Sequence, residues 1–302
     1  MLQAFNYLSE FFSSNFSPCL FFAYFRYNLL MPRALRIPIY TLVWVALAAL
    51  YVPVFIPLYK SRWDQLDYTH AYFILPISLL LLWRRREELA RLPIVENRAW
   101  VPLISIVLGL QLFLLGWRQN YLFVSTFSLI PVAWGLARYL YGPKIAAVTA
   151  FPIGYLLFLV PPPLGVLDSI TLPMRQGVSI VTDLVLAAFE YPIERQGLLL
   201  SIGGQQIYLG EACSGFRSLI TLAALGAVYI HLSRVRAGRK IRMALAIVPL
   251  ALLGNLIRVI AVTLVTYYVG VNAGQKFFHD FSGFLIFVIL IAGLLWIEHR
   301  EE

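Results

Sequence analysis

Charged residues are scarce in this chain of 302 residues: they make up 13% of it, whereas hydrophobic residues make up 60%. Soluble proteins are nearer one quarter charged, so this composition excludes an ordinary soluble domain. Acidic residues are fewer than basic ones, and the resulting net charge of +9 could suggest a nucleic-acid partner. The basic residues, however, lie in short loops between apolar blocks, as the positive-inside rule describes. We therefore expect a membrane protein and no nucleic-acid partner.

Cysteine and histidine are also rare, and the common cofactor motifs are absent. The two cysteines, Cys19 and Cys213, form no CxxC pair, which argues against a quinone-linked thiol oxidoreductase. No internal disulfide is expected, because the topology predicted below places them on opposite sides of the membrane. The four histidines are scattered, at His70, His231, His279 and His299, and show no metal-ligand spacing. No Walker loop, Rossmann glycine pattern or G-x-S-x-G elbow occurs. We expect no metal and no cofactor.

The apolar residues are gathered into blocks long enough to cross a bilayer, which takes about 20 residues per helix. The predicted spans are residues 37–58, 68–83, 100–117, 121–137, 145–160, 215–232, 243–268 and 281–297. The second and fifth are short. The predicted fold is an all-α polytopic bundle of about eight transmembrane helices.

The basic residues predict the orientation of these spans. They cluster after the second, fourth and sixth spans: Arg84, Arg85, Arg86, Arg91 and Arg98, then Arg138 and Lys144, then Arg234, Arg236, Arg239, Lys240 and Arg242. These loops should be cytoplasmic. The C-terminus then returns to the cytoplasm, and residues 161–214 lie outside, with Cys19 and Cys213 on opposite sides.

The outer segment has two parts. Residues 164–190 suit a helix lying at the outer surface, because polar residues interrupt the apolar ones at helical intervals. If this helix crossed instead, the count would become nine and Cys213 would change sides. Residues 193–209 contain two short runs around Gly203 and Gly204, which predict a β-hairpin before the cysteine. Its edge strand could receive an extended peptide.

The N-terminal residues 1–33 are aromatic but contain no unbroken span, and no small-residue cleavage site follows them. We interpret them as an interfacial segment that precedes a transmembrane domain of residues 34–302.

Cys213 is the first candidate for chemistry. It lies in the glycine-flanked stretch 210–218, which opens a hydrophobic helix. Helix N-termini favour negative charge and can lower a thiol pKa well below about 8.5, so a thiolate nucleophile is plausible. The alternative is an inert, small apolar residue.

Arg258 is the second candidate, with Asn255 one turn away on the same helical face. An arginine within a span is costly unless it faces a polar cavity or a partner, which favours a functional role. A structural pair with a carboxylate or with backbone carbonyls is the alternative.

His279 is the third candidate, at the outer mouth of the last span, where histidine can exchange protons near neutral pH. An ordinary polar cap is the alternative for this residue taken alone. The predicted topology brings Cys213, Arg258 and His279 toward the same leaflet. A thiol, a fixed cation and a base are the groups that acyl transfer needs.

These motifs resemble those of the exosortase and archaeosortase family of membrane-embedded cysteine enzymes. The resemblance rests on Glu211-Ala212-Cys213-Ser214-Gly215 with Arg217, Ser218 and Leu219, on Asn255-Leu256-Ile257-Arg258, and on His279 with Gly283. Weaker matches are Tyr68-Thr69-His70 with Pro76 and Arg84-Arg85, and Phe158-Leu159-Val160-Pro161-Pro162-Pro163. The likeness extends from about Trp63 to the C-terminus.

The resemblance implies a cysteine protease and transpeptidase of the inner membrane, with its active site facing the periplasm. Its substrates would be membrane-anchored proteins with a Pro-Glu-Pro type C-terminal sorting signal. Cys213 would form an acyl-enzyme and pass the acyl group to an acceptor whose identity stays open. Which of Arg258 and His279 moves the proton also stays open, although a permanently charged arginine favours Arg258 as electrostatic stabiliser.

A different class of function competes with this interpretation. Arg258 could instead line the polar pathway of a transporter or assembly factor for exported polysaccharide. Such a pathway has no use for a thiol, so Cys213 discriminates between the two.

Overall fold

The computed structural model describes residues 33–60, 70–95, 99–210, 215–274 and 282–299. The chain forms two compact units, residues 1–53 and 54–302. In the first unit the described residues form most of one helix, α3 (Arg33–Leu58), whose last residues belong to the second unit. With 26 residues, α3 is about 39 Å long and can cross a hydrocarbon core of about 30 Å.

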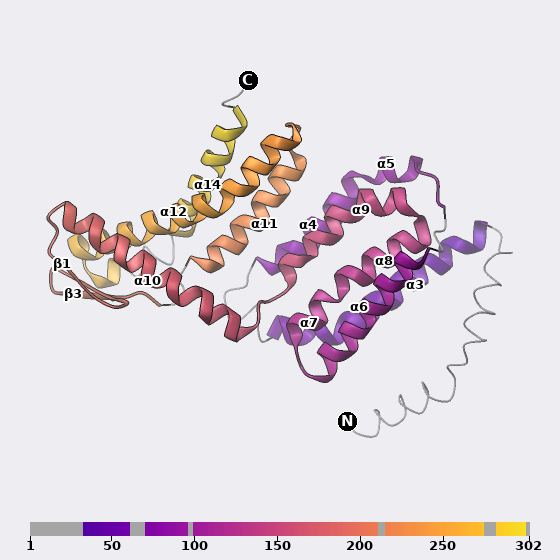
Figure 1. Cartoon of the computed structure of the whole chain (residues 1–302), viewed down its shortest axis with the longest axis horizontal. Helices are drawn as coiled ribbons and strands as arrows, with labels where there is room; N and C mark the ends of the chain where they lie inside the picture. Colours follow the sequence, from indigo (N-terminus) through magenta and orange to yellow (C-terminus); the bar gives the residue numbers. More distant parts are fainter. Residues whose placement is uncertain (1–32, 61–69, 96–98, 211–214, 275–281, 300–302) are drawn as a thin grey trace. The chain divides into compact units, whose positions relative to one another are not determined.

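The second unit begins with a series of helices joined by short connections (Figure 1). They are α4 (Ala71–Arg84), α5 (Arg86–Arg91), α6 (Trp100–Arg118), α7 (Leu122–Phe127), α8 (Leu129–Tyr141), α9 (Pro143–Tyr155) and the 3-10 helix η2 (Leu156–Leu159). Helices α6 and α8 approach closely because glycine lies at their contact. A Cβ atom on Gly135 would lie 2.8 Å from Cγ1 of Ile106. Small residues at such contacts are typical of membrane helix pairs.

Hydroxyl groups join neighbouring helices of this series. Ser78 of α4 donates a hydrogen bond of 2.8 Å to the carbonyl oxygen of Pro152 in α9. Ser105 of α6 donates one of 2.8 Å to the carbonyl oxygen of Pro131 in α8. Both bonds satisfy polar groups within apolar surroundings, as lipid requires.

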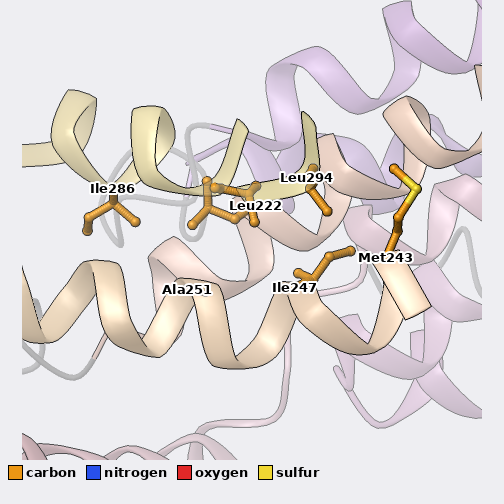
Figure 2. Packing of buried hydrophobic residues seen from close by; sticks show 7 residues of the cluster. Leu222, Met243, Ile247, Ala251, Ile286 and Leu294 are labelled. Atoms are coloured by element: carbon orange, nitrogen blue, oxygen red, sulfur yellow. The ribbon is translucent and has the colours of Figure 1, made fainter. Parts of the chain in front are cut away.

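Helices α11 (Phe216–Leu232), α12 (Ala237–Val269) and α14 (Ser282–His299) form a second bundle. Its core is a cluster of buried apolar residues from all three helices: Leu222, Met243, Ile247, Ala251, Ile286, Leu290 and Leu294. Figure 2 shows Ile286 toward one end of this cluster and Leu294 toward the end near Met243. Helices α12 and α14 therefore run antiparallel.

Polar contacts fasten one end of this bundle. The side chains of Tyr229 and Ser233, at the end of α11, both donate hydrogen bonds to the Glu298 carboxylate. Nη1 of Arg239, in the first turn of α12, donates a hydrogen bond of 2.9 Å to the carbonyl oxygen of Glu298. The end of α14 is thus tied to the connection between α11 and α12.

A helix and a small sheet pack on the other half of α12. Helix α10 (Leu164–Ala188) precedes the antiparallel strands β1 (Ile193–Gln196), β2 (Leu199–Ile202) and β3 (Gln205–Tyr208), with β2 in the centre. Val178 of α10, Leu200 of β2, Leu209 and Val259 of α12 form a second buried cluster. The C-terminal half of α12 is therefore covered by α10 and the sheet, and its N-terminal half by α11 and α14.

The predicted hairpin around Gly203 and Gly204 is confirmed as β2 and β3. Ile202 pairs with Gln205 across the turn, and the two glycines have φ angles of 55° and 79°. Positive φ at both central residues is what a type I′ turn requires, which explains glycine at these positions. Strand β1, which pairs with β2, is an addition that the sequence analysis did not predict.

The apolar helices coincide with the predicted spans. Among the described residues, four helices are long and apolar enough to cross a membrane: residues 39–58, 100–118, 122–141 and 237–269. Shorter apolar helices cover residues 71–84, 143–159, 219–232 and 286–299. The chain is thus a helix-rich, multi-pass membrane protein. The number of crossings, eight, stays a prediction.

Candidate functional site

Of the three predicted site residues, the structure describes Arg258. Cys213 and His279 lie outside the described residues, within segments 211–214 and 275–281. The structure describes the residues that flank both segments. Gly215, α12 and α14 therefore define the surroundings of the candidate site.

Arg258 and Asn255 are buried polar residues in the middle of α12. Asn255 is fully buried and Arg258 is 8% exposed. Val259, the residue after Arg258, belongs to the cluster formed with α10 and the sheet, whereas Ala251, one turn before Asn255, belongs to the cluster formed with α11 and α14. Arg258 therefore lies where the two cores meet. Because burying a charge in a membrane helix is costly, Arg258 is a candidate for a functional role.

Gly215 brings the end of the cysteine motif against Asn255. It adopts a left-handed conformation, with φ of 74°, directly before α11. A Cβ atom at this position would lie 2.6 Å from Cγ of Asn255 and 2.8 Å from its Nδ2. Only glycine allows both the backbone angle and this approach. The backbone two residues after Cys213 thus packs on the side chain one turn before Arg258.

Replacing Gly215 by alanine should lower the stability of the protein more than the same change at Gly197. Both positions have positive φ, at 74° and 63°, so alanine carries a comparable backbone cost of about 1–2 kcal/mol at each. A Cβ atom at Gly197 meets nothing within 4 Å, whereas at Gly215 it meets Asn255. Thermal unfolding in detergent measures the difference. Equal losses in the two variants would show that the Gly215–Asn255 contact is not tight.

The start of α14 packs on α12 immediately beside Asn255. A Cβ atom on Gly254 would lie 3.0 Å from Cγ2 of Ile286, which is itself buried. Ile286 lies in the second turn of α14, which begins at Ser282, three residues after His279. Gly215, which directly follows the segment that contains Cys213, and Ile286, in the second turn after the segment that contains His279, therefore both contact α12 at residues 254–255.

Aromatic residues fix the C-terminal end of α12 to the sheet. The hydroxyl groups of Tyr191 and Tyr268 are 2.9 Å apart, and the rings of Tyr191 and Tyr267 make an edge-on contact with centroids separated by 5.6 Å. A Cβ atom on Gly203 would lie 2.7 Å from the ring of Tyr267. The hairpin turn therefore rests on the last turns of α12, beyond Arg258.

The other histidines lie apart from this region. His70 immediately precedes α4, His231 stacks on Phe151 with ring centroids 3.8 Å apart, and His299 ends α14. Within the part of the chain that the structure describes, no group of three or more His, Cys, Asp or Glu residues could hold a metal ion.

The polar residues of α10 were expected to face the outer surface, but one group of them faces the protein interior. Thr171, Arg175, Ser179 and Thr182 follow one another at helical intervals, on the face that also carries Val178, the contact with Val259. Their three- and four-residue spacing is the signal that could have found them. This face belongs to the surroundings of the candidate site.

Comparison with known proteins supports the resemblance. A family model described as a transmembrane exosortase matches residues 63–296, which is most of the chain. The matched region contains Cys213, Arg258 and His279, together with α10, the sheet and α12. A comparison with curated proteins and one with solved structures return no match. The chain belongs to the transmembrane exosortase family.

Proposed function

We propose that this protein is a cysteine peptidase and transpeptidase of the inner membrane that removes C-terminal sorting signals from exported proteins. The observation that carries the proposal is the contact of Gly215 with Asn255, because it joins the cysteine motif to the arginine motif. Two trans peptide units reach at most about 7.6 Å, so the chain cannot carry residue 213 far from this contact. We expect the thiol of Cys213 to lie near Arg258.

His279 is expected to reach the same stretch of α12 from the start of α14. Ile286 packs against Gly254, and α14 begins three residues after His279. These contacts favour a site in which the cysteine, arginine and histidine come from three segments that meet at residues 254–258.

The proposed reaction has two steps that share one covalent intermediate. The sulfur of Cys213 attacks the scissile carbonyl carbon, and the resulting oxyanion collapses, breaking the C–N bond and leaving a thioester. The departing amine takes a proton, for which His279 is the proposed donor. An acceptor nucleophile then attacks the thioester, gives its proton back to His279 and releases the thiolate. Arg258 would stabilise the negative charge on sulfur or oxygen throughout.

The start of α11 favours this nucleophile. Gly215 caps α11, so residue 213 directly precedes the N-terminus of a helix. The unpaired N–H groups and the dipole at such an end favour an anion over a neutral thiol. The arrangement supports a thiolate at Cys213.

The basic loops are the basis for the proposed eight crossings with a cytoplasmic start, and exposed aromatic residues at helix ends agree with helices that cross a bilayer. Trp83, Trp100, Trp117 and Trp296 are exposed near the ends of α4, α6 and α14. Tryptophan and tyrosine concentrate at both membrane interfaces, and basic loops stay in the cytoplasm. On this basis the segment around Cys213 faces the periplasm.

The test is to trap the acyl-enzyme. Purified protein is mixed with a peptide that carries a C-terminal sorting signal, quenched in acid and digested, and the adduct is located by mass spectrometry. We expect a hydroxylamine-sensitive thioester on Cys213, retained in a Cys19→Ala variant and lost in Cys213→Ala. Cleavage without an adduct on cysteine would contradict the mechanism. A transporter or assembly factor would give neither adduct nor cleavage.

A further inference from the structure

Helix α10 buries a polar face. Thr171, Arg175, Ser179 and Thr182 lie on one side of the helix, since steps of three and four residues return to the same face. Thr171 is 4% exposed, and Ser179 and Thr182 are fully buried. Val178, on the same face, packs with Val259, so this side of α10 faces α12 beside Arg258.

The opposite face of α10 is apolar and exposed. Ile170, Ile180, Val181 and Leu184 are all well exposed, and Leu184 reaches 62%. This pattern is the reverse of that of a surface helix in a soluble protein, where the apolar face is buried. It fits a helix that turns its apolar face to lipid and its polar face to the protein interior. The predicted surface helix is therefore lipid-facing on one side.

The hydrogen bonds of this polar face are incomplete. The Ser179 hydroxyl donates to the carbonyl oxygen of Gly197 at 2.8 Å. The hydroxyl groups of Thr171 and Thr182 and Nε of Arg175 are shielded from solvent, and no hydrogen-bond partner for them occurs among the described residues. Native proteins rarely leave such groups unsatisfied, because desolvation without a partner is costly.

The facing side of α12 does not supply the missing acceptors. Its buried Thr263 and Thr266 use their hydroxyl groups within α12, donating to the carbonyl oxygens of Val259 and Val262, each at 2.9 Å. Asp183, four residues after Ser179, lies half-buried at the edge of this face, but it accepts no hydrogen bond from Thr171, from Thr182 or from Nε of Arg175. Thr171, Arg175 and Thr182 therefore form a row of hydrogen-bond donors along α10, which suits a ligand rich in hydrogen-bond acceptors.

We propose that this face of α10 holds the polypeptide chain of the substrate beside the scissile bond. Thr171, Arg175 and Thr182 would donate hydrogen bonds to its backbone carbonyl oxygens. Thr171 and Arg175 are about 6 Å apart along the helix axis, close to the roughly 6.6 Å at which an extended chain repeats carbonyls on one side. This inference rests on the proposed function and names the element that binds the substrate.

Kinetics of three variants test the role of these donors. We expect Thr171→Val and Thr182→Val each to raise KM for a sorting-signal peptide about 2- to 10-fold, and Arg175→Gln about 10- to 100-fold, with kcat little changed. Arg195→Gln changes an exposed arginine of β1, and Leu184→Thr changes the lipid-facing side of α10. Both controls should keep the wild-type KM.

Thermal stability separates substrate binding from a structural role. Valine replaces threonine with nearly the same shape and removes a donor that has no described partner, so Thr171→Val and Thr182→Val should keep or raise the unfolding temperature. A clear fall in unfolding temperature would show that the hydroxyl groups hold the fold together, and it would overturn the proposal.

Cross-linking locates the substrate without requiring turnover. In a Cys213→Ala background, p-benzoylphenylalanine at the position of Met174, which flanks the polar face, should cross-link the peptide, and at Leu184 it should cross-link lipid. Peptide cross-links at both positions or at neither would overturn the proposal. Cleavage that persists in Cys213→Ala would instead refute the proposed function, whatever the cross-links show.

Discussion

Replacing Cys213 by alanine should abolish signal cleavage, whereas replacing His279 by alanine should leave slow turnover. Alanine at position 213 removes the atom that forms the acyl-enzyme. General acid or base assistance typically contributes about 10²- to 10⁴-fold, so a loss of that size is expected for His279→Ala. The measurement is the initial rate of signal cleavage at equal membrane abundance, from about pH 5.5 to 8.5, the range in which histidine titrates.

Cys19→Ala is the matched control for the thiol and should cleave at the wild-type rate. A wild-type rate and pH profile in His279→Ala would remove His279 from the mechanism and leave Cys213 with Arg258. Residual cleavage in Cys213→Ala would contradict the covalent route altogether.

Replacing Arg258 by lysine should preserve membrane insertion but reduce cleavage by about 10²- to 10³-fold, the loss that follows removal of one oxyanion donor. Lysine keeps the positive charge but lacks the planar fork that can contact two atoms at once. The residue is 8% exposed, so water cannot replace the missing contacts easily. The measurement is kcat for signal cleavage, with insertion checked by protease protection.

Arg242→Lys provides the matched control, because Arg242 belongs to the same helix but is exposed near its start. It should retain wild-type kcat. Full activity in Arg258→Lys would show that charge alone suffices and that guanidinium geometry plays no part.

The sheet shows what local sequence can and cannot predict. Gly203-Gly204 marks a turn whose backbone angles few other residues adopt, and the hairpin was predicted from it. Strand β1, with the sequence Ile-Glu-Arg-Gln, has one apolar residue and no alternation, so nothing local identifies it as a strand. What defines it as a strand is its antiparallel pairing with β2, from Ile193 opposite Ile202 to Gln196 opposite Leu199.

Two helices differ in detail from their predictions, each for its own reason. The periodicity of residues 164–190 identifies a helix, but a sequence cannot tell whether lipid or protein covers each face. Helix α12 begins at Ala237, before the predicted span, because arginine and lysine are good helix formers and the basic residues Arg239, Lys240 and Arg242 extend the helix.

The candidate site stays a prediction, of which the structure describes one residue. Arg258 stood out because a charged residue in an apolar helix is rare, and its burial agrees with that argument. The approach of Gly215 to Asn255 joins residues far apart in the chain, and no periodicity encodes it. Cys213 and His279 stay predictions that rest on the family motifs and on these neighbouring contacts.

Under the proposed function, the position of Arg258 along α12 would set the depth at which a substrate is cut. The 33 residues of α12 span about 50 Å, well beyond a hydrocarbon layer of about 30 Å. If Arg242 marks the inner boundary, a crossing of about 20 residues ends near Val262 and leaves Arg258 about 6 Å beneath the outer boundary. The length of a substrate's membrane anchor would then determine which bond reaches Arg258, and that bond would lie in the outer leaflet. Water is sparse at that depth, which favours an acceptor that itself resides in the membrane over simple hydrolysis.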